Sequence, residues 1–192
     1  MPKAFTRILL FLILLFPVGL SFGQYGYHFG RNKIQYEDFE WKVMKTEHFD
    51  IYYYPEMLEL AEHGAFFAEE AYSELEHRFN FSLNHRVPLI FYSTNLHFKQ
   101  TNVTSGFIPD GVGGFFEFLK GRVVIPANGN LSRFRRVVRH EMVHVFTFNK
   151  VLRVMRDHRQ PSDRFLPLWF TEGLAEYWSG EPDHQHEMVI RD

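Results

Sequence analysis

Three stretches of the chain repeat their hydrophobic residues with a helical period. Over residues 56–79 apolar residues return every three or four positions while glutamates fill the other face, which predicts an amphipathic helix. A second stretch begins at Ser132, a residue type that caps helices, and continues to residue 148. A third helix is expected over residues 168–179, because Gly180 and then Pro182 follow it.

Shorter stretches are rich in β-branched and aromatic residues, as strands are. Residues 41–54 predict one strand that stops at Pro55. Residues 87–92 predict another strand, which contains Pro88. Because proline cannot donate a hydrogen bond to a neighbouring strand, Pro88 favours a position at the edge of a sheet.

Two further strands are expected over residues 111–118 and 122–126, joined by a tight turn at Lys120 and Gly121. Residues 149–166 are basic and contain a proline, which favours a loop or a short irregular helix. The predicted fold class is therefore α+β, with a small, mixed, antiparallel-leaning sheet packed on helices and two helices last in the chain.

The first residues have the pattern of an export signal. Lys3 and Arg7 precede the unbroken apolar run of residues 8–16, and small residues at 21–23 resemble a cleavage site. The run is too short for a comfortable transmembrane helix, although an uncleaved anchor is the alternative. We therefore expect a signal peptide over residues 1–23, an irregular segment over 24–40 and one domain over 41–192. The mature protein would be secreted, or would lie in the periplasm or cell envelope.

Composition excludes several classes of function. The chain has 192 residues, no cysteine and a net charge of −2, which becomes −4 when Lys3 and Arg7 leave with the signal peptide. The lack of cysteine excludes disulfides, thiolate zinc sites and cysteine nucleophiles. Since no block of basic residues follows the signal segment, a nucleic-acid partner is not expected. A stable membrane span is not expected either after the signal peptide is cleaved.

Histidine is unusually frequent, with 11 residues, and two of these histidines form a motif. His140 and His144 stand four positions apart in the helix predicted over 132–148, so both imidazoles project from one face and can reach one ion. Glu141 lies beside them, where a carboxylate can take a proton from a metal-activated water. This pattern is typical of a hydrolytic zinc site.

Two histidines leave such a site one protein ligand short, and the last predicted helix can supply it. Glu172 and Glu176 are also four positions apart and share a face of that helix. Burying these carboxylates beside apolar residues is costly unless a positive charge compensates, and one zinc ion per chain would do so. Two histidines and one of these glutamates would complete the ligand set.

The segment from His140 to His144, followed by Trp-Phe-Thr-Glu-Gly-Leu-Ala-Glu-Tyr at 169–177, resembles the gluzincin metallopeptidases. More narrowly, residues 41–192 are similar to the peptidase MA-like domains of secreted bacterial proteins, which are often followed by a C-terminal propeller domain. The resemblance implies a zincin-like fold and makes Glu172 the third zinc ligand. It also implies that Glu176 binds a ligand histidine from outside the metal's own ligand set.

The expected function is hydrolysis of a peptide or protein substrate, with zinc on His140, His144 and Glu172 and with Glu141 as general base. The strand near residues 115–118 would hold the substrate by edge addition. A catalytically inactive peptidase-like domain that serves binding or envelope assembly is the alternative, because no transition-state donor can be assigned. Zinc-dependent hydrolysis of a non-peptide amide is a weaker alternative. The candidates for the donor are His158, Tyr177, His184 and His186.

Overall fold

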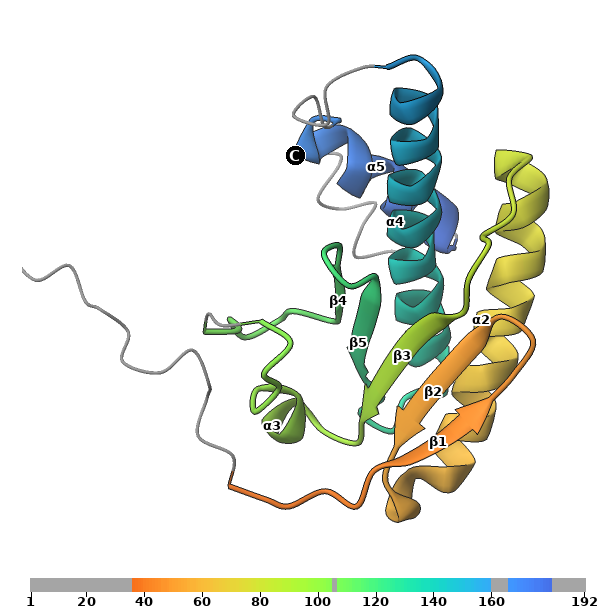
Figure 1. The fold of residues 1–192 in the computed structure, drawn as a ribbon. Coiled ribbons are helices and arrows are strands. Elements are labelled where there is room, and N and C mark those ends of the chain that lie inside the picture. The colour runs from red at the N-terminus through yellow and green to blue at the C-terminus, as the bar shows by residue number, and fades with distance from the viewer. Residues whose placement is uncertain (1–35, 105–106, 160–165, 181–192) are drawn as a thin grey trace, which may run out of the picture. The chain divides into compact units, whose positions relative to one another are not determined.

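The fold is described from a computed structural model, for residues 36–104, 107–159 and 166–180 (Figure 1). The expected signal peptide, most of the segment 24–40, and His184 and His186 lie outside these residues. The described chain has an α+β fold, which confirms the predicted class. No helix in the described ranges is long and apolar enough to cross a lipid bilayer.

The sheet has five strands and mixed direction. In chain order its strands are β1 (Lys42–Lys45), β2 (Phe49–Tyr53), β3 (Val87–Tyr92), β4 (Phe115–Glu117) and β5 (Arg122–Pro126). Their spatial order is β1-β2-β3-β5-β4. The inner pairs β2–β3 and β3–β5 are parallel, whereas the outer pairs β1–β2 and β4–β5 are antiparallel hairpins. The short strand β4 therefore lies at an edge of the sheet, on the side of the molecule that carries the two last helices (Figure 1).

The single strand predicted over residues 41–54 is in fact the two strands β1 and β2. A turn at residues 46–48 separates them, and Thr46 stabilises it. The Thr46 amide donates to the carbonyl of Phe49 at 3.0 Å, and the Phe49 amide donates to the Thr46 hydroxyl at 3.2 Å. Threonine also suits strands, so its role as a turn residue was not evident from the sequence.

The prediction that β3 is an edge strand is wrong, because β3 lies at the centre of the sheet. Successive residues of a strand direct their backbone groups to alternate neighbours. The amide of Val87 donates to the carbonyl of His48 at 2.9 Å, on the β2 side, so Pro88 faces the β5 side. Pairing with β5 begins only at Leu89. Pro88 therefore interrupts no hydrogen bond of the ladder.

Four helices complete the described fold, with a 3₁₀ turn at Pro55–Met57 before the first. They are α2 (Leu58–Phe79), α3 (Asn95–Phe98), α4 (Leu131–Asp157) and α5 (Leu168–Ser179). The prediction for residues 149–157 is wrong, because α4 continues through them. The Lys150 ammonium donates to the carbonyl of Phe79 at 3.2 Å at the end of α2, and Arg153 lies over the Phe81 ring at 5.7 Å. These tertiary contacts stabilise the last turns of α4, which contain three basic side chains. The cap of α4 is Asn130 rather than Ser132, and its side chain accepts from the amide of Arg133 at 2.9 Å.

Helices α2 and α4 pack against each other and cover one face of the sheet (Figure 1). The contact is close at Gly64, where a Cβ atom would lie only 2.4 Å from the ring of Phe91 and 2.9 Å from that of Phe134. Only glycine allows α2 to approach these two buried rings. Packing of α4 on the sheet and on α2 fixes the helix that carries the histidine pair.

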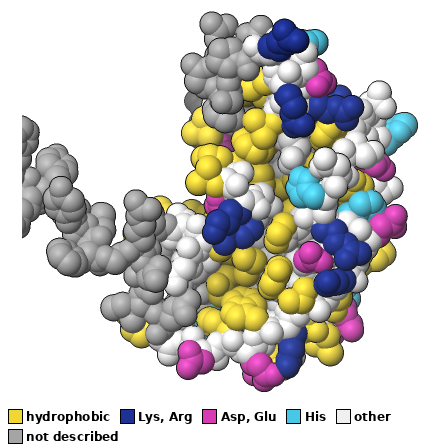
Figure 2. Space-filling view, in the orientation of Figure 1, with side chains coloured by type: hydrophobic (Ala, Val, Ile, Leu, Met, Phe, Trp, Pro, Cys, Tyr) yellow, Lys and Arg dark blue, Asp and Glu magenta, His cyan; other side chains and the backbone are white. Residues whose placement is uncertain are grey.

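An aromatic cluster packs where β2 and β3 end. The Phe39 ring stacks on Tyr54 at 4.8 Å, and Trp41 meets Tyr92 edge-on at 5.4 Å. Figure 2 shows hydrophobic side chains over this part of the molecule with charged side chains among them. The cluster lies at the end of the sheet from which the chain enters β1, so it anchors residues 36–41 to the fold.

Candidate metal centre

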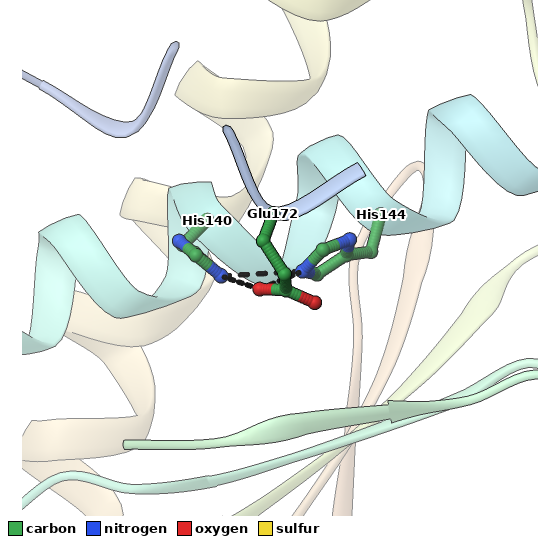
Figure 3. A group of neighbouring side chains, drawn as sticks. All are labelled: His140, His144 and Glu172. Carbon is green, nitrogen blue, oxygen red and sulfur yellow. Dashed lines mark hydrogen bonds and ion pairs between the residues drawn. The ribbon is translucent and has the colours of Figure 1, made fainter. Parts of the chain in front are cut away.

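The histidine pair occupies the face of α4 that is turned away from the core. The opposite face of the helix buries Val138, Met142 and Val145 against the sheet and α2. His140 and His144 lie between that face and solvent, with side-chain exposures of 18% and 15%. Their Nε2 atoms are 3.2 Å apart, so both rings point to one place (Figure 3).

Glu172 reaches the same place from α5. Its Oε2 atom lies 3.5 Å from Nε2 of His140 and 3.4 Å from Nε2 of His144 (Figure 3). Residues that are 28 or more positions apart in the chain therefore lie together. In the described part of the chain, these three residues form the group whose ligand atoms all lie within 4.8 Å of one another.

The distances fit a tetrahedral zinc ion. Zinc binds imidazole nitrogen and carboxylate oxygen at about 2.0–2.1 Å, so two tetrahedral ligand atoms stand about 3.4 Å apart. The three separations in the cluster are 3.2, 3.4 and 3.5 Å. Three ligands of this kind leave a fourth position open for water or substrate, as in hydrolytic sites. Burial lowers the pKa of His144, and the neutral imidazole is the form that binds a metal.

The packing of α5 explains why Glu172 faces α4. Glu172, Ala175, Glu176 and Ser179 share one face of α5 by their spacing, and Ala175 and Ser179 are buried in it. Arg139 of α4 donates to the carbonyl of Trp178 at 2.6 Å. The Trp178 ring meets that of Phe79 edge-on at 5.0 Å. These contacts fix the rotation of α5 about its own axis.

Glu176 lies near the cluster and accepts a hydrogen bond from Arg136. Its Oε1 atom is 3.8 Å from Nδ1 of His140, which is too long for a hydrogen bond. Its Oε2 atom accepts from the Arg136 guanidinium at 2.8 Å. Glu176 therefore stands beside the ring nitrogen of His140 that faces away from Glu172, where its charge acts on the imidazole.

Glu141 is the most deeply buried acid near the cluster. Its residue is 5% exposed, and burial together with the neighbouring Glu172 carboxylate raises its pKa to about 8. Gly114 makes room for it, since a Cβ atom at Gly114 would lie 3.1 Å from Oε1 of Glu141. The loop before β4 thus approaches the Glu141 carboxylate by its backbone alone.

Two cavities meet at the cluster. One, of about 320 Å³, extends past His144, and we call it the aromatic cavity because rings line it. Its lining beyond the metal cluster includes Phe115, Phe116, Phe118, Thr147, Phe148, Val151 and Leu166. The other, of about 1090 Å³, extends past His140 towards the start of α4 and is lined by Arg133, Arg135, Arg136 and Arg139. A cleft with an apolar half and a basic half therefore crosses the candidate metal centre.

The candidates for a transition-state donor do not reach this cleft within the described ranges. Tyr177 is 78% exposed, and His158 is exposed at the end of α4; neither lines either cavity. Sequence reasoning missed Thr147, Arg133 and Gly114, which do line it. Helical spacing was the available signal for the first two, because each stands seven positions from His140 and so shares its face.

The chain was compared with protein-family models, with curated proteins and with solved structures, and nothing matches it in any of the three comparisons.

Proposed function

We propose that this protein is a zinc-dependent peptidase of gluzincin type, in which His140, His144 and Glu172 hold one zinc ion. The observation that carries the proposal is the triangle of ligand atoms with sides of 3.2, 3.4 and 3.5 Å. The two Nε2 atoms and the carboxylate oxygen are all atoms that bind zinc in proteins, and they are directed at one point. A cation at that point satisfies all three.

The residues around the triangle suit hydrolysis. A zinc ion bound there supplies a Lewis acid that polarises the scissile carbonyl and lowers the pKa of the attacking water. Glu141 accepts the proton of that water and delivers it to the leaving amine. Its burial excludes bulk water from the carboxylate, and the backbone at Gly114 packs closely beside it.

Strand β4 suits an extended peptide as substrate. It is at an edge of the sheet, and Phe115 and Phe116 line the cavity beside the triangle. An edge strand offers unpaired backbone groups that can pair with an added strand. The substrate would lie between β4 and the metal ligands, with its backbone held and its side chains directed into the cleft.

The direct test is an unbiased peptide-cleavage screen of the zinc-loaded protein, with the same protein stripped of zinc as its control. Cleavage that appears with zinc and disappears without it is the expected result. A protein that holds one zinc per chain and cleaves no peptide would contradict the proposal. It would favour the alternative of an inactive binding or envelope-assembly domain.

We also propose that residues 1–23 are an export signal, on the evidence of Lys3, Arg7 and the apolar run after them. Export would place the peptidase outside the cytoplasm, as a secreted, periplasmic or cell-envelope protein. N-terminal sequencing of the exported protein should begin at or near Gln24. A mature chain that still carries Met1 would contradict this part of the proposal.

A further inference from the structure

Helix α5, which carries the third candidate ligand, buries few apolar side chains. Of its residues only Ala175 and Ser179 are buried, whereas Leu168, Trp169 and Tyr177 are each at least 73% exposed. Among the described elements, α4 is the one against which α5 packs extensively. Tertiary packing of an apolar face supplies most of the stability of a helix in a protein. Since α5 has little such packing, its place beside α4 depends on polar contacts.

One of these polar contacts satisfies the C-terminal end of α5. Nε of Arg139 donates to the carbonyl of Trp178 at 2.6 Å, from a side chain that is 20% exposed. The last four carbonyls of a helix have no partner within it, and a basic side chain at that end also interacts favourably with the helix dipole. A charged donor makes such a hydrogen bond about twice as strong as a neutral one. Because Arg139 precedes His140 directly, this bond joins the end of α5 to the part of α4 that carries the first ligand.

The guanidinium of Arg139 is oriented by α2. Its Nη2 atom pairs with Oε2 of Glu74, and the other oxygen of Glu74 pairs with Nη2 of Arg78 at 2.6 Å. The Arg78 guanidinium in turn lies over the Trp178 ring, 5.6 Å from its centre. Burial alone would raise the pKa of Glu74, but its bonds to Arg139 and Arg78 hold that pKa below its ordinary value. Since the donors of a guanidinium form a rigid fork, the pair with Glu74 also fixes the direction of Nε.

The chain repeats this arginine–glutamate pair one helical turn earlier, where it joins α4 to α2. Arg135 of α4 donates to both oxygens of Glu70 of α2, through Nε at 2.9 Å and through Nη2. The two residues stand four positions before Arg139 and Glu74, so the two pairs join the same helices at successive turns. In Arg135 the Nε donor is used on α2, whereas in Arg139 it reaches α5. The two arginines therefore differ in their contact with α5.

We infer that Arg139 is a positioning residue for the metal centre, because it holds α5 where Glu172 meets the histidine pair of α4. This inference rests on the proposed function, since it requires zinc at that site. Glu172 stands six positions before Trp178, about 9 Å along the helix axis, so a helix that is held at Trp178 also holds Glu172. Without the bond from Arg139, α5 leaves its place in a fraction of the molecules. Zinc then binds tightly only to the remaining fraction, which raises the apparent Kd accordingly.

The test is the Kd for zinc of the parent and three variants, measured by competition with a chelator. Arg139→Lys keeps the charge and can still pair with Glu74, but it lacks the fork whose second donor reaches Trp178. We expect its Kd to rise about tenfold, the order of one charge-assisted hydrogen bond. Arg139→Gln should raise the Kd at least as much. Because this change removes a positive charge near the ion, Coulomb's law alone would predict tighter binding, so the sign separates positioning from electrostatics. Arg135→Gln, the matched control, should stay within about twofold of the parent.

Hydrogen exchange of the metal-free protein gives a readout that does not depend on zinc. The backbone amides of α5 should exchange faster in Arg139→Lys than in the parent, and at the parent's rate in Arg135→Gln. An equal Kd for the parent and Arg139→Lys would overturn the inference, and so would an equal rise in Arg135→Gln. A parent that binds no zinc would contradict the proposed metal centre and overturn the inference with it. Faster exchange in Arg139→Lys would then show that the error lies in the metal and not in the attachment of α5.

Discussion

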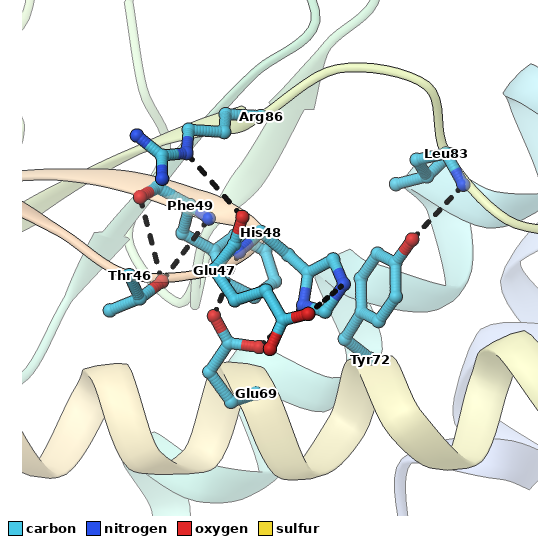
Figure 4. A network of polar contacts seen from close by, with 8 residues as sticks. All are labelled: Thr46, Glu47, His48, Phe49, Glu69, Tyr72, Leu83 and Arg86. Carbon is cyan, nitrogen blue, oxygen red and sulfur yellow. Dashed lines mark hydrogen bonds and ion pairs between the residues drawn. The ribbon is translucent and has the colours of Figure 1, made fainter.

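Two parts of the molecule pair histidine with glutamate, and only one of them has the geometry of a metal site. In the first, His140 and His144 of α4 face Glu172 of α5 beside an open cleft (Figure 3). In the second, His48, in the turn between β1 and β2, meets Glu69 of α2 (Figure 4). The residue types are the same, so the difference between the two lies in how their polar atoms are satisfied.

The His48 network is closed. The Nδ1 atom of His48 lies 2.7 Å from Oε2 of Glu69, and the His48 amide donates to Oε1 at 3.0 Å. The imidazole stacks on the Tyr72 ring with centroids 3.6 Å apart. Burial alone would raise the pKa of Glu69, but the hydrogen bonds from His48 and Thr46 hold it below its ordinary value. Each carboxylate oxygen therefore has a donor, and the ring is covered.

The cluster on α4 and α5, by contrast, has converging polar atoms and a cleft beside it. Two imidazole nitrogens lie 3.2 Å apart and share one carboxylate oxygen. Burial and the neighbouring Glu172 carboxylate raise the pKa of the buried acid beside them, Glu141, whereas hydrogen bonds lower that of Glu69. The comparison shows that nearness of histidine to glutamate does not identify a metal site. Convergence of unshared lone pairs beside a cavity is the more specific sign.

The largest expected effect separates the roles of the acids within the open cluster. Glu141→Gln keeps the size of the side chain and removes the base, so we expect hydrolysis to fall on the order of 10²-fold or more. Zinc content should remain that of the parent, since Glu141 is not one of the three ligands. Kinetics on a screened peptide, with metal analysis of the same sample, measure both. Equal rates for variant and parent would show that Glu141 is not the base.

The raised pKa of Glu141 predicts a pH effect in the metal-free protein. Between its ordinary value of 4.5 and its folded value of about 8, the folded state holds a proton that the unfolded state has lost. The stability that this proton provides is therefore complete below about pH 4.5 and is lost as the pH rises through about 8. We expect the Tm of the metal-free parent to fall by several degrees relative to that of Glu141→Gln between about pH 5 and pH 8.

The control for this experiment lies within the same cluster. The lowered pKa of His144 acts in the opposite direction, because its contribution is lost as the pH falls. Glu141→Gln keeps His144, so the difference between the two melting curves isolates Glu141. If the Tm of the metal-free parent and the Tm of Glu141→Gln changed with pH in parallel over the whole range, the burial of an acid at this position would be contradicted.

The smallest of these effects concerns the closed network. Glu69→Ala leaves the amide and ring of His48 without their acceptor, and since the side chains of both residues are 28% exposed we expect a loss of about 1–2 kcal/mol in the free energy of unfolding. Zinc content and the rate of hydrolysis should not change. Denaturant unfolding followed by fluorescence measures the loss. A fall in zinc content in this variant would remove the distinction between the two sites.

Sequence reasoning found the residues of the candidate metal centre because helical spacing fixes which residues share a face. His140 and His144, and separately Glu172 and Glu176, follow from a period of 3.6 alone. Their convergence required tertiary contacts that the sequence does not display, such as the bond from Arg139 to the carbonyl of Trp178. The resemblance to gluzincins predicted Glu172 rather than Glu176 as the third ligand, and Glu172 is the one that converges with the histidines.

The errors in the predicted fold have physical causes of the same kind. Pro88 predicts an edge strand, although its missing amide faces the β5 side, where pairing has not begun. The basic side chains and the proline of residues 149–166 predict a loop or a short irregular helix, whereas contacts of Lys150 and Arg153 with neighbouring segments stabilise α4 to its end at Asp157. Local pattern predicts where elements form, whereas these positions depend on partners that are distant in the chain.

Metal analysis of three proteins tests the central claim most directly. The purified parent should hold about one zinc per chain, and Glu172→Ala should lose it, because two histidines alone leave the ion without its third ligand. Glu69→Ala removes the same kind of side chain from the closed network and should keep the zinc. This pattern would establish His140, His144 and Glu172 as the zinc ligands. Full zinc retention in Glu172→Ala would contradict the assignment.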